Sequence, residues 1–187
     1  IGKAYLRGFH HAMHELNADV VVEFDADLQH PPNTIPVLLA AIADGADFVI
    51  GSRWIRGGSY PDHWDPKRLF LSRVGGLVAR VLLFFPRPVF FKVTDPTSGL
   101  RAKRVEGVLD RIDLDDIRSH GFGYKIELLQ KLSLVTRAIK EIPLRFEERA
   151  AGSSKMTGQT AGEVFRAAIW SRAHDPWTRQ FLKFAVV

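Results

Sequence analysis

The chain has 187 residues, of which 46% are hydrophobic and 25% charged, so it can form one domain with a sizeable core and is unlike an intrinsically disordered chain. It contains no cysteine, which excludes disulfides and thiolate metal sites. The formal net charge of +5 favours an anionic ligand, an anionic membrane surface or nucleic acid, and does not choose among them.

The first half of the chain predicts a strand, a helix and a second strand in succession. After a helix over residues 3–17, the apolar pattern predicts a buried strand over 19–25, a helix from residue 33 or 34 to 44, and a buried strand over 47–51. This spacing is typical of a βαβ unit, so we expect an α/β fold with a mostly parallel sheet flanked by helices. Ligands bind such sheets beyond the carboxyl ends of the strands.

Two carboxylates leave the first of these strands together. Asp25 and Asp27 are followed by Gln29, and the prolines at positions 31 and 32 prevent the strand from continuing. Carboxylate and amide oxygens are suitable ligands for Mg²⁺ or Mn²⁺. A solvated acidic turn is the alternative, because two aspartates one residue apart are a weak motif on their own.

The middle of the chain is rich in aromatic residues. Residues 54–65 are typical of a loop, and a loop of this length in a compact domain is more often functional than idle. A helix follows over residues 66–85, and residues 84–91 place four phenylalanines around two prolines. Two interpretations remain open: a core helix with a packed turn, or an amphipathic element with basic residues toward lipid phosphates and aromatic residues toward acyl chains.

The second half of the chain predicts shorter elements. These are a turn at 95–99 feeding a short strand near 100–102, a helix over 124–134, a strand within 137–148 and a helix over 159–173. Between the last two, a loop of small residues lies between Arg149 and Lys155. Its backbone amides and the two cations are suited to an anion.

Several cations are spread along the sequence, and no catalytic nucleophile accompanies them. There is no Ser-His-Asp or cysteine arrangement, and the histidines lack the spacing of metal ligands, so we interpret them as surface or packing residues. If they cluster, the cations would suit two anionic groups and a divalent ion. They are Arg53, Arg68, Arg73, Arg149 and Lys155.

Together, these motifs resemble the dolichol- or polyprenol-phosphate mannosyltransferases, inverting family 2 glycosyltransferases with the GT-A (nucleotide-diphospho-sugar transferase) fold. The resemblance covers roughly residues 2–160, in order and at sensible spacing. The residues that carry it are 24–32, 49–54 and 56–59, then Trp64, Lys67, Arg68 and 71–73, and finally 95–99 and 152–156.

The resemblance implies roles on the donor side. Asp25, Asp27 and Gln29 would hold Mg²⁺ or Mn²⁺ on the donor diphosphate. Arg53 would reach the phosphates near the site of transfer, so that Asp27 and Arg53 are the residues expected nearest the chemistry.

It also implies roles on the acceptor side. Arg68, Ser72 and Arg149 would engage the lipid phosphate, with Lys155 a further candidate. Asp95 would shape the acceptor side or bind the sugar.

The activity that the resemblance implies is inverting transfer of mannose from GDP-mannose to a polyprenyl (dolichyl) monophosphate at the cytoplasmic face of a membrane. The acceptor is already an anionic nucleophile, so no side chain need deprotonate it. The expected partners are a nucleotide sugar, a polyprenyl phosphate and a membrane surface, without nucleic acid. The alternatives are another donor such as UDP-glucose, a nucleotidyltransferase on a similar sheet, and a non-catalytic module that binds anionic lipid or nucleic acid.

Two boundaries follow from the same resemblance. Residues 1–175 would be a catalytic domain without the amino-terminal strand that binds the nucleotide in this family, so the fold is expected to be amino-terminally truncated. Residues 176–187 would begin a membrane-spanning domain or a linker. Because much of the donor specificity lies in that amino-terminal region, the motifs favour GDP-mannose only through the resemblance.

Overall fold

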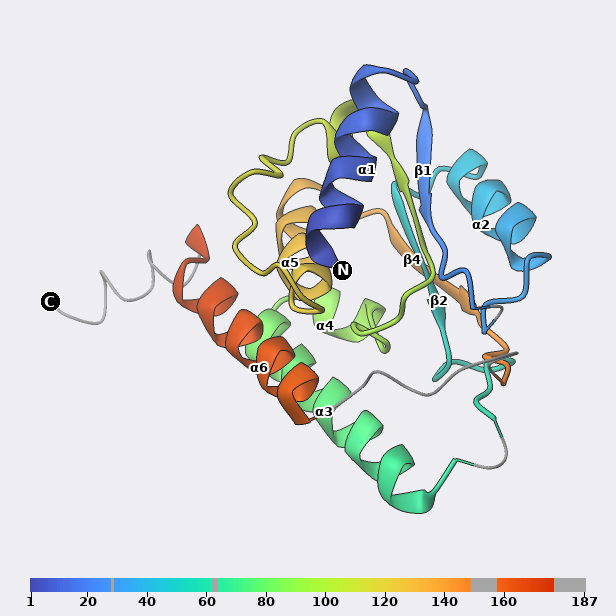
Figure 1. Ribbon diagram of the computed structural model, residues 1–187, viewed down its shortest axis with the longest axis vertical. Helices are drawn as coiled ribbons and strands as arrows, with labels where there is room; N and C mark the ends of the chain where they lie inside the picture. Colours follow the sequence, from blue (N-terminus) through green and yellow to red (C-terminus); the bar gives the residue numbers. More distant parts are fainter. Residues whose placement is uncertain (28, 62–63, 149–157, 177–187) are drawn as a thin grey trace, which may run out of the picture.

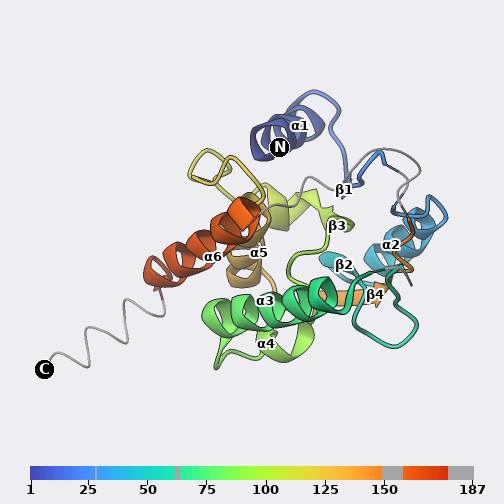
Figure 2. The same cartoon turned by 60° about the horizontal axis from the view of Figure 1, so that its bottom comes forward.

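A computed structural model of the chain has a four-stranded sheet between helices (Figure 1). It describes residues 1–27, 29–61, 64–148 and 158–176, without the side chains of residues 67, 68, 71 and 158–161. Helix α2 covers one face of the sheet, and α1 and α5 lie on the other (Figures 1 and 2). The α/β class expected from the sequence is confirmed.

The strands follow the order β1-β3-β2-β4 across the sheet. Their bounds are β1 Val20–Glu23, β2 Phe48–Ser52, β3 Arg101–Arg104 and β4 Ile139–Pro143. Strand β3 pairs antiparallel with both β1 and β2, whereas β2 pairs parallel with β4. Strands β1, β2 and β4 therefore share one direction, as expected.

The prediction of a mostly parallel sheet needs one correction. We expected β1 and β2 to be neighbours in a βαβ unit, but β3 lies between them, so the described sheet is mixed and only one of its pairings is parallel. The physical reason is that β3 returns to the middle of the sheet from a distant part of the chain. Its polar sequence gave no sign of a central strand.

The sheet is buried on both faces because β2 alternates its side chains between two cores. Phe48 and Ile50 belong to the larger core, which includes residues of α1 and α5. Val49 belongs to the smaller core, with Leu38 and Ile42 of α2. A strand that is apolar at every position is typical of a sheet covered on both sides.

The helices agree closely with the sequence pattern. They are α1 Gly2–His14, α2 Thr34–Ala43, α3 Pro66–Phe84, α4 Val89–Lys92, α5 Tyr124–Val135 and α6 Gly158–Ala173, with a distorted helical turn η1 at Val105–Leu109. The expected strand at 137–148 is shorter than predicted, since only residues 139–143 pair with β2. The described residues of the expected loop, 54–61 and 64–65, lie outside helices and strands, and the turn at 95–99 stands where it was expected.

Helices α3 and α6 pack side by side beyond the sheet (Figures 1 and 2). Four large apolar side chains of α3 are exposed at positions 70, 74, 77 and 81, which is the spacing of one helix face. They are Phe70, Val74, Leu77 and Val81. Within the described residues, none of the helices combines the length and apolar character needed to cross a bilayer.

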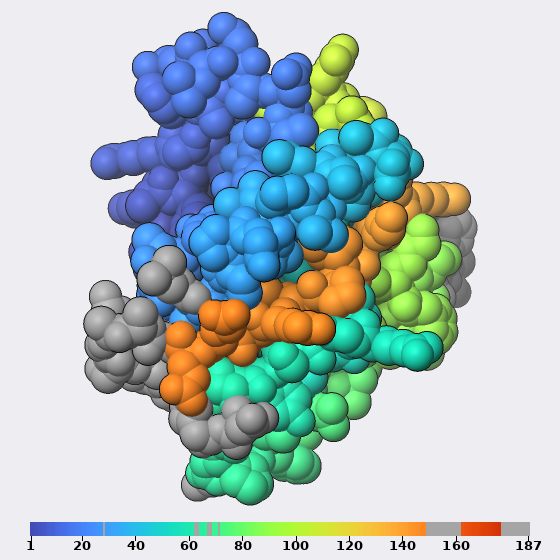
Figure 3. Space-filling model, turned by 90° about the vertical axis from the view of Figure 1, so that its right-hand side faces the viewer, coloured from blue at the N-terminus to red at the C-terminus, as the bar shows by residue number. Residues whose placement is uncertain are grey.

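The face that carries α2 shows how the end of the sheet is enclosed. In Figure 3 the chain that follows β4, coloured orange, runs between α2 and the loop that follows β2. Ser59 in that loop forms a β-bridge with Arg145. This segment therefore fastens the loop after β2 close to the carboxyl ends of the parallel strands.

Candidate active site

The acidic motif leaves β1 as a short loop that folds back on itself. The backbone N–H of Asp25 donates to His30 Nδ1 at 3.2 Å, and that of Gln29 donates to Asp27 Oδ1 at 3.2 Å. His30 is buried, and its ring packs against those of Phe24 and Phe146. The interpretation of His30 as a packing residue is therefore confirmed, and its packing sets the path of the motif.

The loop is also tied to neighbouring elements. Tyr5 of α1 donates its hydroxyl to Asp25 Oδ1 at 2.8 Å. The side-chain amide of Gln29 donates to the carbonyl of Glu147 at 3.3 Å, and the backbone N–H of Glu147 returns a hydrogen bond to the carbonyl of Gln29 at 3.0 Å. Contacts from α1 and from the segment after β4 thus hold the acidic loop in place.

The chemistry of this donor set fits a hard divalent cation. Asp25 and Asp27 are both partly exposed, so their oxygens can be reached from solvent. Among the described residues, no three His, Cys, Asp or Glu side chains gather as a metal-binding group. An ion held here would therefore take the rest of its ligands from Gln29, water or substrate, as Mg²⁺ commonly does.

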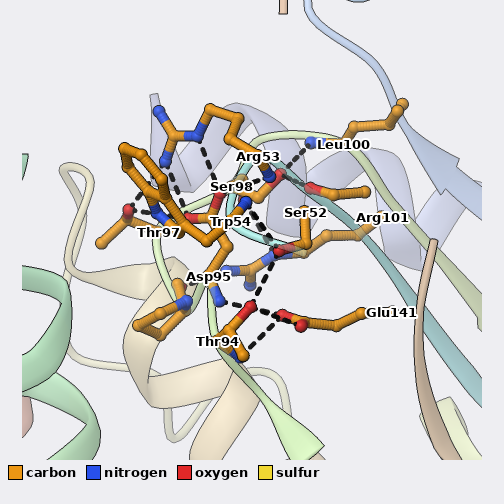
Figure 4. Close-up of polar contacts among 12 residues, drawn as sticks. Ser52, Arg53, Trp54, Thr94, Asp95, Thr97, Ser98, Leu100, Arg101 and Glu141 are labelled. Atoms are coloured by element: carbon orange, nitrogen blue, oxygen red, sulfur yellow. Dashed lines mark hydrogen bonds and ion pairs between the residues drawn. The ribbon is translucent and has the colours of Figure 1, made fainter. Parts of the chain in front are cut away.

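Arg53, which directly follows β2, forms a two-point ion pair with Asp95 (Figure 4). Its Nε lies 2.7 Å from Asp95 Oδ2 and its Nη2 lies 2.7 Å from Oδ1, and Nη2 also donates to Thr97 Oγ1. Within the described residues Nη1 makes no hydrogen bond. One edge of the guanidinium is thus held by Asp95 and Thr97.

Asp95 is completely buried, and its charge depends on this pairing. Burial opposes ionisation, but the Arg53 guanidinium and the hydrogen bonds to the carboxylate hold the pKa of Asp95 below its ordinary value. Glu141 of β4 accepts hydrogen bonds from the backbone N–H groups of Thr94 and Asp95, each at 2.8 Å. In the structure the Asp95 carboxylate pairs with Arg53, and the role on the acceptor side or at the sugar expected for Asp95 stays a prediction.

The turn at residues 95–99 is held by a buried arginine. Arg101 of β3 donates to three backbone carbonyls, those of Pro96 at 2.6 Å, Ser98 at 2.9 Å and Lys125 at 2.8 Å. Ser98 in turn donates its hydroxyl to the carbonyl of Gly51 at 2.5 Å. The turn is therefore fixed to both β2 and α5.

A second buried network lies under the acidic motif. Glu23, the last residue of β1, accepts hydrogen bonds from the Lys103 ammonium and from the Tyr124 hydroxyl, the latter at 2.6 Å. Burial opposes its charge, but Lys103, Arg101 and Lys125 lower the pKa of Glu23 to about 2. Burial, partly offset by Glu23, lowers the pKa of Lys103 to about 8.

The surroundings of His30 place the two halves of the predicted site close together, because the His30 ring and the Arg53 guanidinium lie 5.6 and 5.5 Å from the centroid of the same Phe146 ring. Burial lowers the pKa of His30, as do the charges of Lys125 and Arg53, while Asp25 and Asp27 oppose that shift. All four charges act on one imidazole. The structure thus brings Asp25, Asp27 and Arg53 to the same end of the sheet, as the carboxyl-end rule predicts.

Aromatic residues connect this end of the sheet to α3. The guanidinium groups of Arg53 and Arg73 both lie over the ring of Trp54, at 5.5 and 5.1 Å from its centroid. Ser72 precedes Arg73 on α3 and is half-buried. Arg68 lies one turn earlier on α3, and its side chain is not among those described.

Two of the predicted cations, Arg149 and Lys155, lie outside the described residues. Conversely, the sequence reasoning did not single out Tyr5 or Lys125, both of which reach Asp25 or its surroundings. The signal for Lys125 was weak, because a lysine in the first turn of a helix is usually a solvated surface residue.

Comparisons with known proteins agree with these features. The model of "Glycosyl transferase family 2" matches residues 1–103. The undecaprenyl-phosphate mannosyltransferase of Micrococcus luteus is 38% identical to the chain, over 92% of the chain and 68% of that protein.

Two further curated relatives carry similar names. The dolichol-phosphate mannosyltransferase of Pyrococcus furiosus is 36% identical over 100% of the chain and 49% of that protein. The polyprenol monophosphomannose synthase of Mycolicibacterium smegmatis is 37% identical over 91% of the chain and 61% of that protein. The chain thus spans from about half to about two thirds of the length of these relatives.

Proposed function

Because the chain belongs to glycosyltransferase family 2, we propose that the protein transfers mannose from GDP-mannose to a polyprenyl monophosphate such as dolichyl or undecaprenyl phosphate. One observation carries this proposal: relatives from separate organisms, each 36–38% identical, are named as mannosyltransferases or a phosphomannose synthase acting on polyprenols. The mixed α/β sheet flanked by helices is consistent with the GT-A fold of this family.

On the donor side, the residues that follow β1 and β2 would bind the diphosphate. Family 2 glycosyltransferases generally use a divalent metal. We propose that Asp25, Asp27 and Gln29 hold it and that it is Mg²⁺ or Mn²⁺. Such an ion supplies charge neutralisation to the leaving diphosphate. Arg53, held on one edge by Asp95, would direct its other edge to a phosphate oxygen and lose little freedom on binding.

On the acceptor side, the nucleophile is an anionic phosphate oxygen, so the protein need not supply a general base. Its task is to hold two anions that repel each other in a position for attack on the face of the anomeric carbon opposite the diphosphate. We propose Arg68 and Ser72 of α3, together with Arg149 and Lys155, for the lipid phosphate. Arg73 over Trp54 links α3 to the donor side and supports this assignment.

The exposed apolar stripe of α3 supports a lipid acceptor. Phe70, Val74, Leu77 and Val81 face outward from the same helix that carries Arg68 and Ser72. An amphipathic surface with basic residues beside apolar ones is typical of a helix that lies in a membrane interface. We propose that α3 rests on the cytoplasmic face of a membrane and receives the polyprenyl phosphate from it.

The direct test measures transfer of labelled sugar to polyprenyl phosphate by the full-length protein that contains this chain. We expect transfer from GDP-mannose, little from UDP-glucose, and loss of transfer in EDTA that Mg²⁺ or Mn²⁺ restores. Transfer that continues in EDTA would contradict the metal assignment. Transfer from UDP-glucose alone would overturn the donor while leaving the family intact, and no transfer from either would overturn the activity.

A substitution of Asp27 tests whether the metal binds at the acidic motif. Replacing Asp27 by asparagine keeps the shape of the side chain and removes its charge, so we expect transfer to fall by at least about 100-fold. Asp115→Asn, at an exposed aspartate that pairs with the partly exposed His10, is the matched control and should transfer normally. Equal activity in both variants would remove Asp27 from the site.

A further inference from the structure

Lys125, in the first turn of α5, carries a buried ammonium group that the preceding reaction does not use. The residue is only 5% exposed. Its backbone carbonyl accepts a hydrogen bond from Arg101, but within the described residues its Nζ makes no hydrogen bond or ion pair. The ammonium lies over the face of the Tyr5 ring, 5.6 Å from the centroid. An ammonium has three N–H donors, and leaving them unpaired away from water is costly.

The ammonium points at the space above Gly99. A Cβ atom at residue 99 would stand 3.0 Å from Lys125 Nζ, 2.6 Å from Asp25 Oδ2 and 2.9 Å from His30 Cε1. Gly99 itself is partly exposed, and so is Asp25. A donor and an acceptor thus flank a glycine, and the absence of a Cβ atom there allows the ends of both side chains to lie close to its backbone.

The other charges nearby already have partners of their own. Glu23 is bonded to Lys103 and Tyr124, and Asp25 Oδ1 is bonded to Tyr5. Lys125 is therefore not required to neutralise either carboxylate by direct contact. Burial lowers the pKa of Lys125, an effect that Asp25 and Glu23 oppose and that Arg101 and Arg53 reinforce.

The nature of the ligand follows from the two groups that face it. A phosphate oxygen over Gly99 would approach Asp25 Oδ2 as well as the ammonium and would be repelled by the carboxylate. A hydroxyl can accept from Lys125 and donate to Asp25 at the same time. The pair therefore suits a neutral group that is both donor and acceptor, beside the carboxylates proposed to hold the donor diphosphate.

We propose that Lys125 and Asp25 Oδ2 flank a hydroxyl-binding subsite over Gly99, which holds one hydroxyl of the transferred sugar. This inference rests on the proposed glycosyl transfer and adds a residue that positions the sugar and contributes to its specificity. The carboxylate of Asp25 has enough lone pairs to accept from a hydroxyl and from Tyr5 while also ligating a metal.

The first test compares binding of GDP-mannose with binding of GDP, which lacks the sugar, by calorimetry on the full-length protein. Lys125→Met keeps the length of the side chain without its donors, so we expect about tenfold or greater weakening for GDP-mannose and unchanged binding of GDP. Lys125→Gln, which keeps an N–H donor, should recover part of the loss. Lys131→Met, at a half-exposed lysine of the same helix, should bind both ligands as the wild type does.

The second test identifies the hydroxyl. Among GDP-deoxymannoses that each lack one hydroxyl, one should bind more weakly than GDP-mannose to the wild type but equally to Lys125→Met. Equal weakening of GDP and GDP-mannose by Lys125→Met would place Lys125 on the diphosphate and overturn the proposal. Unchanged binding of GDP-mannose would overturn it as well.

The third test fills the space directly. Gly99→Ala places a methyl group against the ends of the Asp25 and Lys125 side chains, and should weaken GDP-mannose relative to GDP. Gly8→Ala, at a helical glycine with open space around it, is the control. Thermal unfolding of each variant shows whether it is folded.

These binding measurements do not require turnover, so they test the hydroxyl-binding subsite separately from the proposed transfer reaction. If the wild type binds GDP-mannose but transfers nothing, the proposed function fails while the subsite is still tested. If it binds UDP-glucose instead, the same comparison is made with UDP-glucose and UDP.

Discussion

Arg53 is a largely buried charge at the candidate site, and its ion pair with Asp95 offsets the free-energy cost of burying it. The Asp95 side chain has no contact with solvent, and the Arg53 side chain that pairs with it is 11% exposed. Each charge would be unstable in this setting without the other. The pairing leaves Arg53 with a fixed orientation before any ligand arrives, which is favourable for electrostatic catalysis.

A substitution of Asp95 should therefore affect stability and activity together. We expect Asp95→Asn to lower the free energy of unfolding by about 3 kcal/mol, because it leaves a buried guanidinium without its counter-charge. Transfer should also fall, since Arg53 is no longer oriented. Urea unfolding and the transfer assay measure the two effects.

The control for this prediction is Asp116→Asn, which removes an exposed ion pair with Lys131 and should cost far less stability. If Asp95→Asn is as stable as Asp116→Asn and transfers normally, the positioning role assigned to Asp95 is wrong.

At the scale of the element, α3 has one face toward the protein and one apolar face toward solvent. One face packs against α6 and the core, with Ala79 and Leu83 buried. The opposite face exposes Phe70 and Leu77, at 64% and 50%. Large exposed apolar residues at helical spacing are typical of a surface that contacts another apolar phase.

We expect the double substitution Phe70→Ser and Leu77→Ser to weaken binding to vesicles of anionic lipid by at least about tenfold, because two apolar side chains no longer leave water. Cosedimentation with vesicles is the measurement. Leu134→Ser, at an exposed leucine of α5, should bind like the wild type. A wild-type protein that does not bind vesicles, or a double variant that binds equally well, would contradict the interfacial role of α3.

The elements also show what could be predicted from the sequence. The bounds of α2, α3 and α5 followed from local apolar periodicity, and the proximity of Asp25, Asp27 and Arg53 followed from the rule for strand ends. Strand β3 could not be placed in the same way. Its Arg101 and Lys103 are typical of a surface, and they are buried only because distant carbonyls and Glu23 satisfy them.

Lys125 could not be predicted either, because its burial also depends on contacts with distant residues. Its neighbours Tyr5, Asp25 and Gly99 lie far away in the chain, and only the folded arrangement gives the ammonium its setting. Polar residues that become buried through tertiary contacts carry no periodic signal. Sequence patterns therefore located Asp25, Asp27 and Arg53 at one end of the sheet but not all the residues that surround them.

At the scale of the whole molecule, the buried Glu23 network joins β1, β3 and α5 and should govern part of the response to acid. A carboxylate whose pKa is lower in the folded state stabilises that state above its unfolded pKa and loses this contribution as pH falls. For Glu23 the window runs from about 4.5 down to about 2. The loss over this range is about 3 kcal/mol.

We expect the stability of the wild type to fall more steeply between these pH values than that of Glu23→Gln, as measured by urea unfolding at a series of pH values. Glu106→Gln, at an exposed glutamate, should follow the wild type. Parallel curves for the wild type and Glu23→Gln would show that Glu23 does not titrate with a lowered pKa.

The central position of β3 has a consequence for the order in which the molecule can assemble. Asp25 and Arg53 are synthesised before β3, the strand that separates and aligns β1 and β2 and ends at Arg104. Until β3 has been synthesised, β1 and β2 have no shared strand to pair with. Strand β4, the other partner of β2, is synthesised later still. Pairings between such distant segments form slowly because long loops must close first. We infer that the site forms late, after its charged residues have already been synthesised.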